Sequence, residues 1–264
     1  MTLTTKTPNT RAILPDTIGQ LVEKPITEES VTFDSRIAQT VRITTNKFRA
    51  PVVEKDAGAA WLEEGAELML SDAEISEVEC EPSKVGGLSA ATNELLEDSN
   101  PDAMSIIGRG LARSIIDKID AATFGKLPAP APQGLESFAG VQKIDTELTN
   151  LDDIARAVML SELEGGSLTA LVTDPVTALR LSTLKTAAAS NQPLLNSDAT
   201  ESTKQRAQGL PIISTRHVLP NTIWAIDASM LVAVLRKGTS VQASDQPLFT
   251  SDKTLIRAMG LLHG

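Results

Sequence analysis

The clearest hydrophobic pattern in the chain lies just before its midpoint. Apolar residues recur there every four positions, at Ile107, Leu111, Ile115 and Ile119. This spacing places them on one face of a helix. The Asn-Pro-Asp sequence at 100–102 suits the cap, the first position and the positive end of that helix. The pattern predicts a helix over 101–124, followed by a loop in the proline-rich stretch 127–134.

Shorter patterns precede this helix. The spacing of Ile18, Leu21 and Val22 predicts a short amphipathic helix within 13–31, which Pro25 interrupts. The residues before it are rich in threonine and are expected to form an arm. β-Branched and alternating apolar residues predict two strands, at 36–45 and 85–92.

Between these strands the pattern is that of a long hairpin. The segment 46–72 combines glycines and other small residues with an exposed-looking pair, Trp61 and Leu62, and predicts an extended outgoing strand and turn. The return strand is expected near 75–80, where apolar residues are interleaved with acids that we expect to face water: Glu74, Glu77, Glu79 and Glu81.

The second half of the chain alternates helix and strand. Two helices are predicted, at 151–163 and 175–185, the second capped by Asp174. Strands are predicted at 168–173, 210–214, 222–226, 231–235 and 240–243. The polar stretch 187–208 is expected to be a functional or poorly ordered loop, and 254–262 is an apolar closing segment.

Composition narrows the class of protein. The 264 residues are 41% hydrophobic and 22% charged, which is ordinary for a globular chain of one large or two modest domains. Aromatic residues make only 3%, so the core must be aliphatic and stacking on single-stranded nucleic acid is not expected. The lone Cys80 excludes an internal disulfide, and no cofactor or metal is predicted. Neither a membrane span nor a secretory signal is indicated, which predicts synthesis in the cytoplasm.

The net charge of −10 is concentrated in one segment. Residues 56–100 hold one Lys against twelve Asp and Glu, while 1–55 sum to +2 and 101–264 to −1. Such a segment is either a solvated face or a docking surface for a basic partner. The chain shows no basic patch of the kind that a sequence-specific DNA reader needs.

Candidate catalytic motifs are weak. Ser182 and Lys185 have S-x-x-K spacing but lack the accompanying motifs, and Gly108 and Gly110 are better explained by helix packing than by a phosphate loop. The two histidines, His217 and His263, lack metal or triad spacing, and Glu63 and Glu64 point to opposite faces of a strand. An arm, a long hairpin and a long helix without site chemistry favour a protein that acts through its contacts.

Several motifs, in order, resemble the major capsid proteins of tailed double-stranded DNA phages, which have the Hong Kong 97-type fold. Over most of residues 50–260 the similar segments are Ala60-Trp61-Leu62-Glu63-Glu64-Gly65, Glu94-Leu95-Leu96-Glu97-Asp98-Ser99, Asp120-Ala121-Ala122 through Gly125, Gln133-Gly134-Leu135, Gly209-Leu210-Pro211-Ile212, and Ser251-Asp252 with Ile256-Arg257-Ala258.

The resemblance implies an α+β shell subunit with four parts. These are an N-arm (1–33), a peripheral domain (34–139) with the extended E-loop at about 45–80 and a spine helix (101–124), an axial domain (140–245), and a short return to the peripheral domain (246–264). Such subunits form hexamers and pentamers that close into an icosahedral phage head around double-stranded DNA. The resemblance also implies a structural, non-enzymatic role in the virion, assembly in the host cytoplasm, and a portal and a decoration protein as partners. Because the chain begins almost at the arm, without the N-terminal scaffolding segment that some relatives cleave off, a separate scaffolding protein is expected as well.

The resemblance further assigns contact surfaces. The E-loop residues Trp61, Leu62, Glu63, Glu64 and Glu67 would lie over an adjacent subunit, and basic residues of the arm and its flank would supply countercharge: Lys6, Arg11, Arg42, Lys47 and Arg49. A loop at the capsomer axis would present Asn191, Leu194, Leu195 and Asn196.

Two departures from the family pattern matter. Relatives continue further past the region of Arg257, which places the completeness of the peripheral sheet in question, and no Asn follows Asn221, so Lys–Asn crosslinking is not predicted.

Two alternatives remain: an encapsulin-like compartment around enzyme cargo, and a soluble hydrolase that uses Ser182 and Lys185. Particle formation separates shells from a hydrolase, and packaged DNA separates the two kinds of shell.

Overall fold

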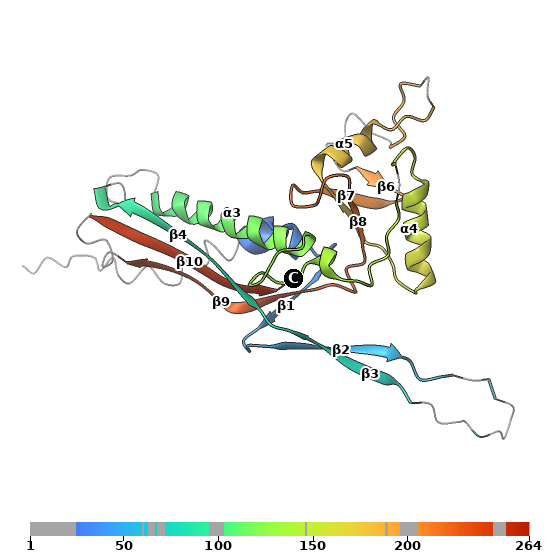
Figure 1. The fold of residues 1–264 in the computed structure, drawn as a ribbon, viewed down its shortest axis with the longest axis horizontal. Coiled ribbons are helices and arrows are strands. Elements are labelled where there is room, and N and C mark those ends of the chain that lie inside the picture. Colours follow the sequence, from blue (N-terminus) through green and yellow to red (C-terminus); the bar gives the residue numbers. More distant parts are fainter. Residues whose placement is uncertain are drawn as a thin grey trace, which may run out of the picture.

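The fold combines a long helix, two four-stranded sheets and a separate two-stranded ribbon (Figure 1). The computed structural model describes residues 25–59, 61–62, 67, 72–94, 103–145, 147–187, 190–195, 205–244 and 252–263. The predicted residues Ile18, Leu21 and Val22 lie outside these ranges. Residues 25–29 are helical, and the prediction that Pro25 interrupts the preceding helix stays a prediction, since that helix lies outside the described ranges.

The larger sheet packs against the long helix α3 (Ala103–Phe124). Its strands run in the order β1 (Gln39–Ile43), β9 (Val232–Ser244), β10 (Lys253–His263) and β4 (Ser83–Thr92). The apolar stripe predicted for α3 is buried against this sheet, where Ile115 and Ile119 join Ile256 and Ala258 in one core. Gly87 is at the closest approach, since a Cβ there would lie 2.9 Å from Leu111 Cδ2.

Two sequence predictions about this sheet are corrected. The strands predicted at 231–235 and 240–243 are one continuous strand, β9, which pairs with both β1 and β10. A boundary at residue 245 therefore cuts through the larger sheet, and the smaller sheet ends before residue 232. The closing strand β10 pairs with β4 on one side and with β9 on the other.

The smaller sheet has the order β6 (Arg206–Ala207), β7 (Leu210–Ser214), β5 (Ala170–Thr173) and β8 (Ile223–Ile226). The helices α4 (Asp152–Leu163) and α5 (Pro175–Thr183) accompany it (Figure 1). Arg206 and Ala207 were predicted as part of a loop. They form a strand because Gln208 and Gly209, with φ of 51° and 81°, make the tight turn that returns the chain into β7.

The carboxylate of Asp174 caps α5, as predicted. It accepts hydrogen bonds from the backbone N–H of Val176 (3.0 Å), Thr177 (3.1 Å) and Asn221 (3.2 Å). Burial alone would raise the pKa of Asp174, but the hydrogen bonds to the carboxylate outweigh it and lower the pKa.

We expect Asp174→Ala to destabilise the subunit by about 1–2 kcal/mol at neutral pH, because the cap is lost. Since the folded-state pKa is lowered, the carboxylate stabilises the fold above its unfolded pKa of about 3.9 and stops doing so as the pH falls through the lower, folded value. Denaturant unfolding of the wild type and the variant should therefore differ at pH 7 and converge in strong acid. An equal difference in the free energy of unfolding at pH 7 and in strong acid would contradict this prediction.

A buried carboxylate joins the start of the described chain to α3. The Oδ1 atom of Asp120 accepts hydrogen bonds from Ser30 Oγ (2.6 Å), Thr32 Oγ1 (2.7 Å) and the backbone N–H of Thr32 (3.1 Å). The backbone N–H of Val31 donates to its other oxygen at 3.3 Å. Asp120 is 2% exposed, so these bonds hold residues 30–32 against the helix out of contact with water.

Candidate functional site

The candidate contact site is the two-stranded ribbon, which belongs to neither of the two larger sheets in the described part of the chain. Strand β2 (Phe48–Lys55) pairs with β3 (Glu74–Cys80) alone, and the two form a sheet of their own that projects away from the larger sheet (Figure 1). This confirms the hairpin that the sequence predicts. A two-stranded ribbon in water is marginally stable by itself, so its side chains need contacts elsewhere.

The pairing register gives the ribbon two different faces. Phe48 lies opposite Cys80, and Ala50 lies opposite Val78, so these four side chains and Val52 share one face. The face is apolar but is not covered by the described part of this chain: Val78 is 56% exposed and Val52 is 41% exposed. The sequence had not revealed this face, because strand register decides which residues share it.

The opposite face is charged near the base of the ribbon. Lys47 forms ion pairs with Glu81 (2.6 Å) and Glu79 (3.5 Å), and Arg49 pairs with Glu79 at 2.7 Å. The hydrogen bond between Lys47 and Glu81 raises the pKa of Lys47 and lowers the pKa of Glu81. Lys47 and Arg49 had been expected to supply countercharge to an adjacent subunit. Within the subunit they form ion pairs in their own hairpin, because antiparallel pairing places them beside its acids, and their contact with an adjacent subunit stays a prediction.

Toward the tip the ribbon is apolar on this face as well. Val53 and Ile75 lie opposite each other and are 55% and 65% exposed. Beyond them, Trp61 is fully exposed at 104% and Leu62 is 48% exposed. Glu67 is also exposed, and the other predicted contact residues of this segment, Glu63 and Glu64, lie outside the described residues.

The other predicted contact residues are exposed, buried or outside the described ranges. Arg42 lies on β1, exposed, while Lys6 and Arg11 lie outside the described ranges. In the predicted axial loop, Asn191 and Leu194 are exposed, and Asn196 is outside the described ranges. Leu195 is only 6% exposed and packs in the core of the smaller sheet, so the expectation that it presents a contact surface is wrong.

The candidate catalytic residues do not form a catalytic arrangement. Ser182 Oγ donates to the backbone oxygen of Leu179 at 2.7 Å, and Lys185 Nζ donates to that of Asn191 at 3.2 Å, so the two side chains are not bonded to each other. His217 Nε2 lies 3.1 Å from Asp117 Oδ1, where it helps to join the loop after β7 to α3. Within the described residues, no cluster of His, Cys, Asp and Glu could hold a metal ion.

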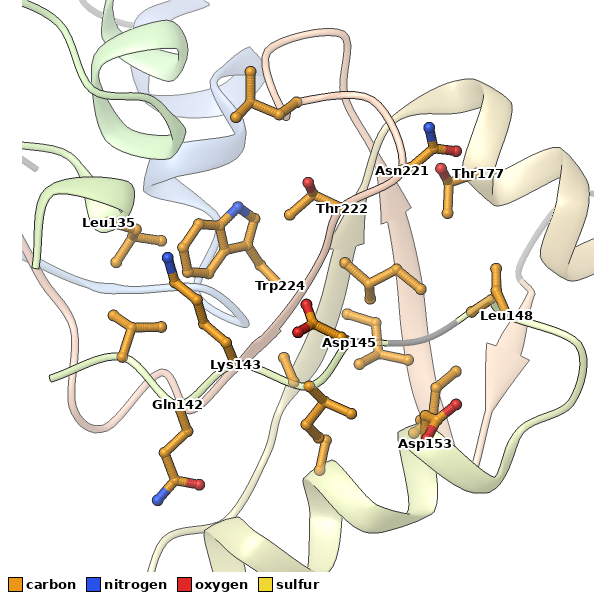
Figure 2. A pocket seen from close by; sticks show the side chains of 18 of the residues that line it. Leu135, Gln142, Lys143, Asp145, Leu148, Asp153, Thr177, Asn221, Thr222 and Trp224 are labelled. Carbon is orange, nitrogen blue, oxygen red and sulfur yellow. The ribbon is translucent and has the colours of Figure 1, made fainter. Parts of the chain in front are cut away.

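A groove of about 420 Å³ lies between the segment 135–148, helix α4 and strand β8 (Figure 2). Apolar side chains such as Trp224, Ile144 and Leu148 line much of it, and Lys143 and Asp145 come from the segment that crosses it. The lining residues include neither histidine nor cysteine. Arg180 is already engaged, since its guanidinium donates to Asn221 Oδ1 (2.9 Å) and to the backbone oxygen of Glu147 (3.0 Å). We assign no chemistry to this groove.

The fold is therefore α+β: a long helix packs on one sheet, a second sheet has its own helices, and a ribbon with exposed apolar side chains projects from them. Solved structures with this fold include proteins of Microbacterium phage Oxtober96 (TM-score 0.72, 18% identity, 88% of this chain and 83% of that chain) and Mycobacterium phage Adephagia (0.67, 15%, 88% and 82%). Another is the capsid of a native GTA particle (0.65, 16%, 100% and 91%). A comparison with curated proteins finds no match.

A sequence profile described as the phage capsid family matches residues 12–264. The chain belongs to that family and has the α+β phage capsid fold that the sequence motifs predicted. It is a major capsid protein, and so a structural component of the virion capsid. No helix in the described part of the chain is long and apolar enough to span a membrane.

Proposed function

We propose that this protein assembles through its ribbon into hexamers and pentamers, which close into an icosahedral shell around double-stranded DNA. The observation that carries the proposal is the ribbon itself. Its exposed apolar residues Val52, Val53, Ile75 and Val78 are covered by nothing in the described part of the chain. Val52 and Val78 lie on one face of the ribbon and Val53 and Ile75 on the other, and exposed apolar side chains grouped in this way mark a surface that another chain covers. Burying it on a neighbouring subunit stabilises both the ribbon and the shell.

The strands of the larger sheet are opposite in charge to the ribbon. Its four strands contain Lys and Arg at Arg42, Lys84, Arg236, Lys237, Lys253 and Arg257, and no Asp or Glu. Because Gly87 faces α3, Lys84 and Leu88 face away from it, and Leu88 is 62% exposed opposite Arg257. We propose that this mixed cationic and apolar face receives the acidic, apolar ribbon of a neighbour.

The remaining roles follow from the same proposal. Residues 1–33 serve as an arm and 34–139, with the ribbon as E-loop, as the peripheral domain. The axial domain begins near residue 140 and ends before β9, because β9 belongs to the larger sheet. The loop of this domain that holds Asn191 and Leu194 lies at the capsomer axis. Assembly takes place in the host cytoplasm with a separate scaffolding protein, a portal and a possible decoration protein. The protein itself has no enzymatic activity.

The proposal is tested by measuring particle size and recording negative-stain images of the purified protein at low and moderate salt. We expect shells or discrete hexamers and pentamers, and slower assembly at moderate salt, because salt screens the attraction between the acidic ribbon and the cationic sheet. The double variant K84Q/R257Q should assemble more slowly at low salt and show a weaker salt dependence. A protein that stays monomeric would contradict shell assembly, and an assembly rate indifferent to salt would contradict the electrostatic docking.

A further inference from the structure

The exposed side of α3 differs in charge from the chain as a whole. The chain has a net charge of −10, but the two acids of this helix are both engaged. Asp120 accepts its hydrogen bonds from residues 30–32, and Asp117 is held by Arg216 and His217. The hydrogen bond from Arg216 lowers the pKa of Asp117, so this carboxylate remains ionised and its charge is balanced by Arg216.

Three arginines follow one another along this side of the helix. Arg109 and Arg113 are exposed and one turn apart, and no carboxylate of the described residues forms an ion pair with either. One turn further, Arg216 reaches the helix through Asp117, with 70% of its side chain exposed. Successive turns of a helix are 5.4 Å apart, so the arginines form a stripe of regularly spaced guanidinium groups. We call Arg109, Arg113 and Arg216 the arginine stripe.

The surface between these arginines is small and polar. Gly110 and Ser114 lie there, and a Cβ at Gly110 would meet nothing within 4 Å. Apart from Ile106 at its start, the stripe offers no large apolar side chain to a partner. It is therefore poorly suited to the ribbon of a second copy, whose exposed valines and isoleucine need apolar contacts. The open face of the larger sheet, with Leu88, suits that ribbon better.

We propose that the arginine stripe contacts the phosphate backbone of the enclosed double-stranded DNA, and that α3 accordingly faces the inside of the shell. This inference rests on the proposed function, because it presumes a shell that encloses DNA. Guanidinium groups bind phosphate oxygens in a planar, bidentate geometry and remain charged at every physiological pH. Contacts to phosphate carry no sequence information, so a stripe of arginines holds DNA of any sequence. The net charge of the chain is −10, so attraction for DNA has to come from local cationic surfaces such as this stripe.

The test measures binding of the purified full chain to a short double-stranded DNA fragment of mixed sequence over a range of salt concentrations. Each phosphate contact adds about 1 to the slope of log affinity against log salt. We expect R109Q/R113Q to reduce the magnitude of this slope by about 2. The variant R109K/R113K, which keeps both charges, should retain most of the slope. Because both side chains are exposed, the thermal unfolding of either variant should match that of the wild type.

A matched control removes the same charge elsewhere. Lys143 and Arg156 are exposed bases near the smaller sheet, and K143Q/R156Q should leave the slope unchanged. Equal loss of slope in both glutamine variants would overturn the proposal, because only net charge would then matter. Impaired assembly of R109Q/R113Q with unchanged DNA binding would also overturn it and assign the stripe to a second copy of the chain. Failure of the wild type to assemble would count against the proposed shell and is read separately, from particle size.

Discussion

A Trp61→Ala variant is expected to lose shell assembly at protein concentrations where the wild type assembles, while its subunit remains folded. Trp61 is 104% exposed in the subunit, so its removal costs the subunit no packing. In an interface, a buried tryptophan of this kind typically contributes about 2 kcal/mol or more. A loss of about 2 kcal/mol is roughly a 30-fold weaker association at each contact, and a closed shell repeats the contact for every subunit.

The measurement is the yield of particles by sedimentation and negative stain, together with the thermal unfolding of the subunit. Phe138→Ala is the matched control, because Phe138 is also an exposed aromatic residue (53%) but lies outside the ribbon. We expect it to assemble as the wild type does. Normal particle yield from Trp61→Ala would remove Trp61 from the proposed contact, and equal defects in both variants would show that the effect is not specific to the ribbon.

The second large effect is expected at the buried carboxylate. Asp120→Ala should lower the free energy of unfolding of the subunit by about 3 kcal/mol, because it leaves Ser30, Thr32 and the backbone N–H of Val31 without their acceptor in a buried place. For a chain of this size, each kcal/mol lowers Tm by roughly 2–4 °C. Denaturant unfolding of the unassembled subunit measures the change.

Two variants separate the contribution of the hydrogen bonds from that of charge. Asp120→Asn keeps one acceptor oxygen and should lose less stability than Asp120→Ala. Asp117→Ala removes a carboxylate one turn away, whose side chain is 39% exposed, and should cost no more than about 1 kcal/mol, as surface ion pairs do. Equal losses in the free energy of unfolding from Asp117→Ala and Asp120→Ala would contradict the prediction, because burial of Asp120 would then not account for its contribution to stability.

These two residues illustrate what motifs in the sequence could and could not show. Trp61 and Asp120 both belong to segments that resemble phage capsid proteins, yet the segments alone do not give a reason for either residue. The structure supplies one for Asp120, since its four hydrogen-bond donors come from residues about 90 positions earlier in the chain. Gly134, in another such segment, is explained in the same way: a Cβ there would lie 2.0 Å from the backbone oxygen of Ala122.

The contact surfaces were predictable to different degrees. The hairpin and its acidic character followed from local alternation and charge, which depend on neighbouring residues only. The ion pairs of Lys47 and Arg49 within their own hairpin could not be predicted, because they depend on the register of β2 on β3, and register is decided by pairing across the turn. The arginine stripe also needed the structure, because Arg216 joins α3 from a loop 99 residues away from Asp117.

The sequence by itself determined the long helix α3, the hairpin, the cap at Asp174, the α+β class and the family. All of these depend on periodicity, capping residues or short motifs, which act over a few residues. Only the tertiary structure decided that β9 and β10 join β1 and β4 in one sheet without acids and that the ribbon has an apolar face. It also decided that the acids of α3 are engaged by distant residues, while Arg109 and Arg113 form no ion pair with a described carboxylate. These features depend on pairings between residues far apart in the chain, and no local pattern specifies them.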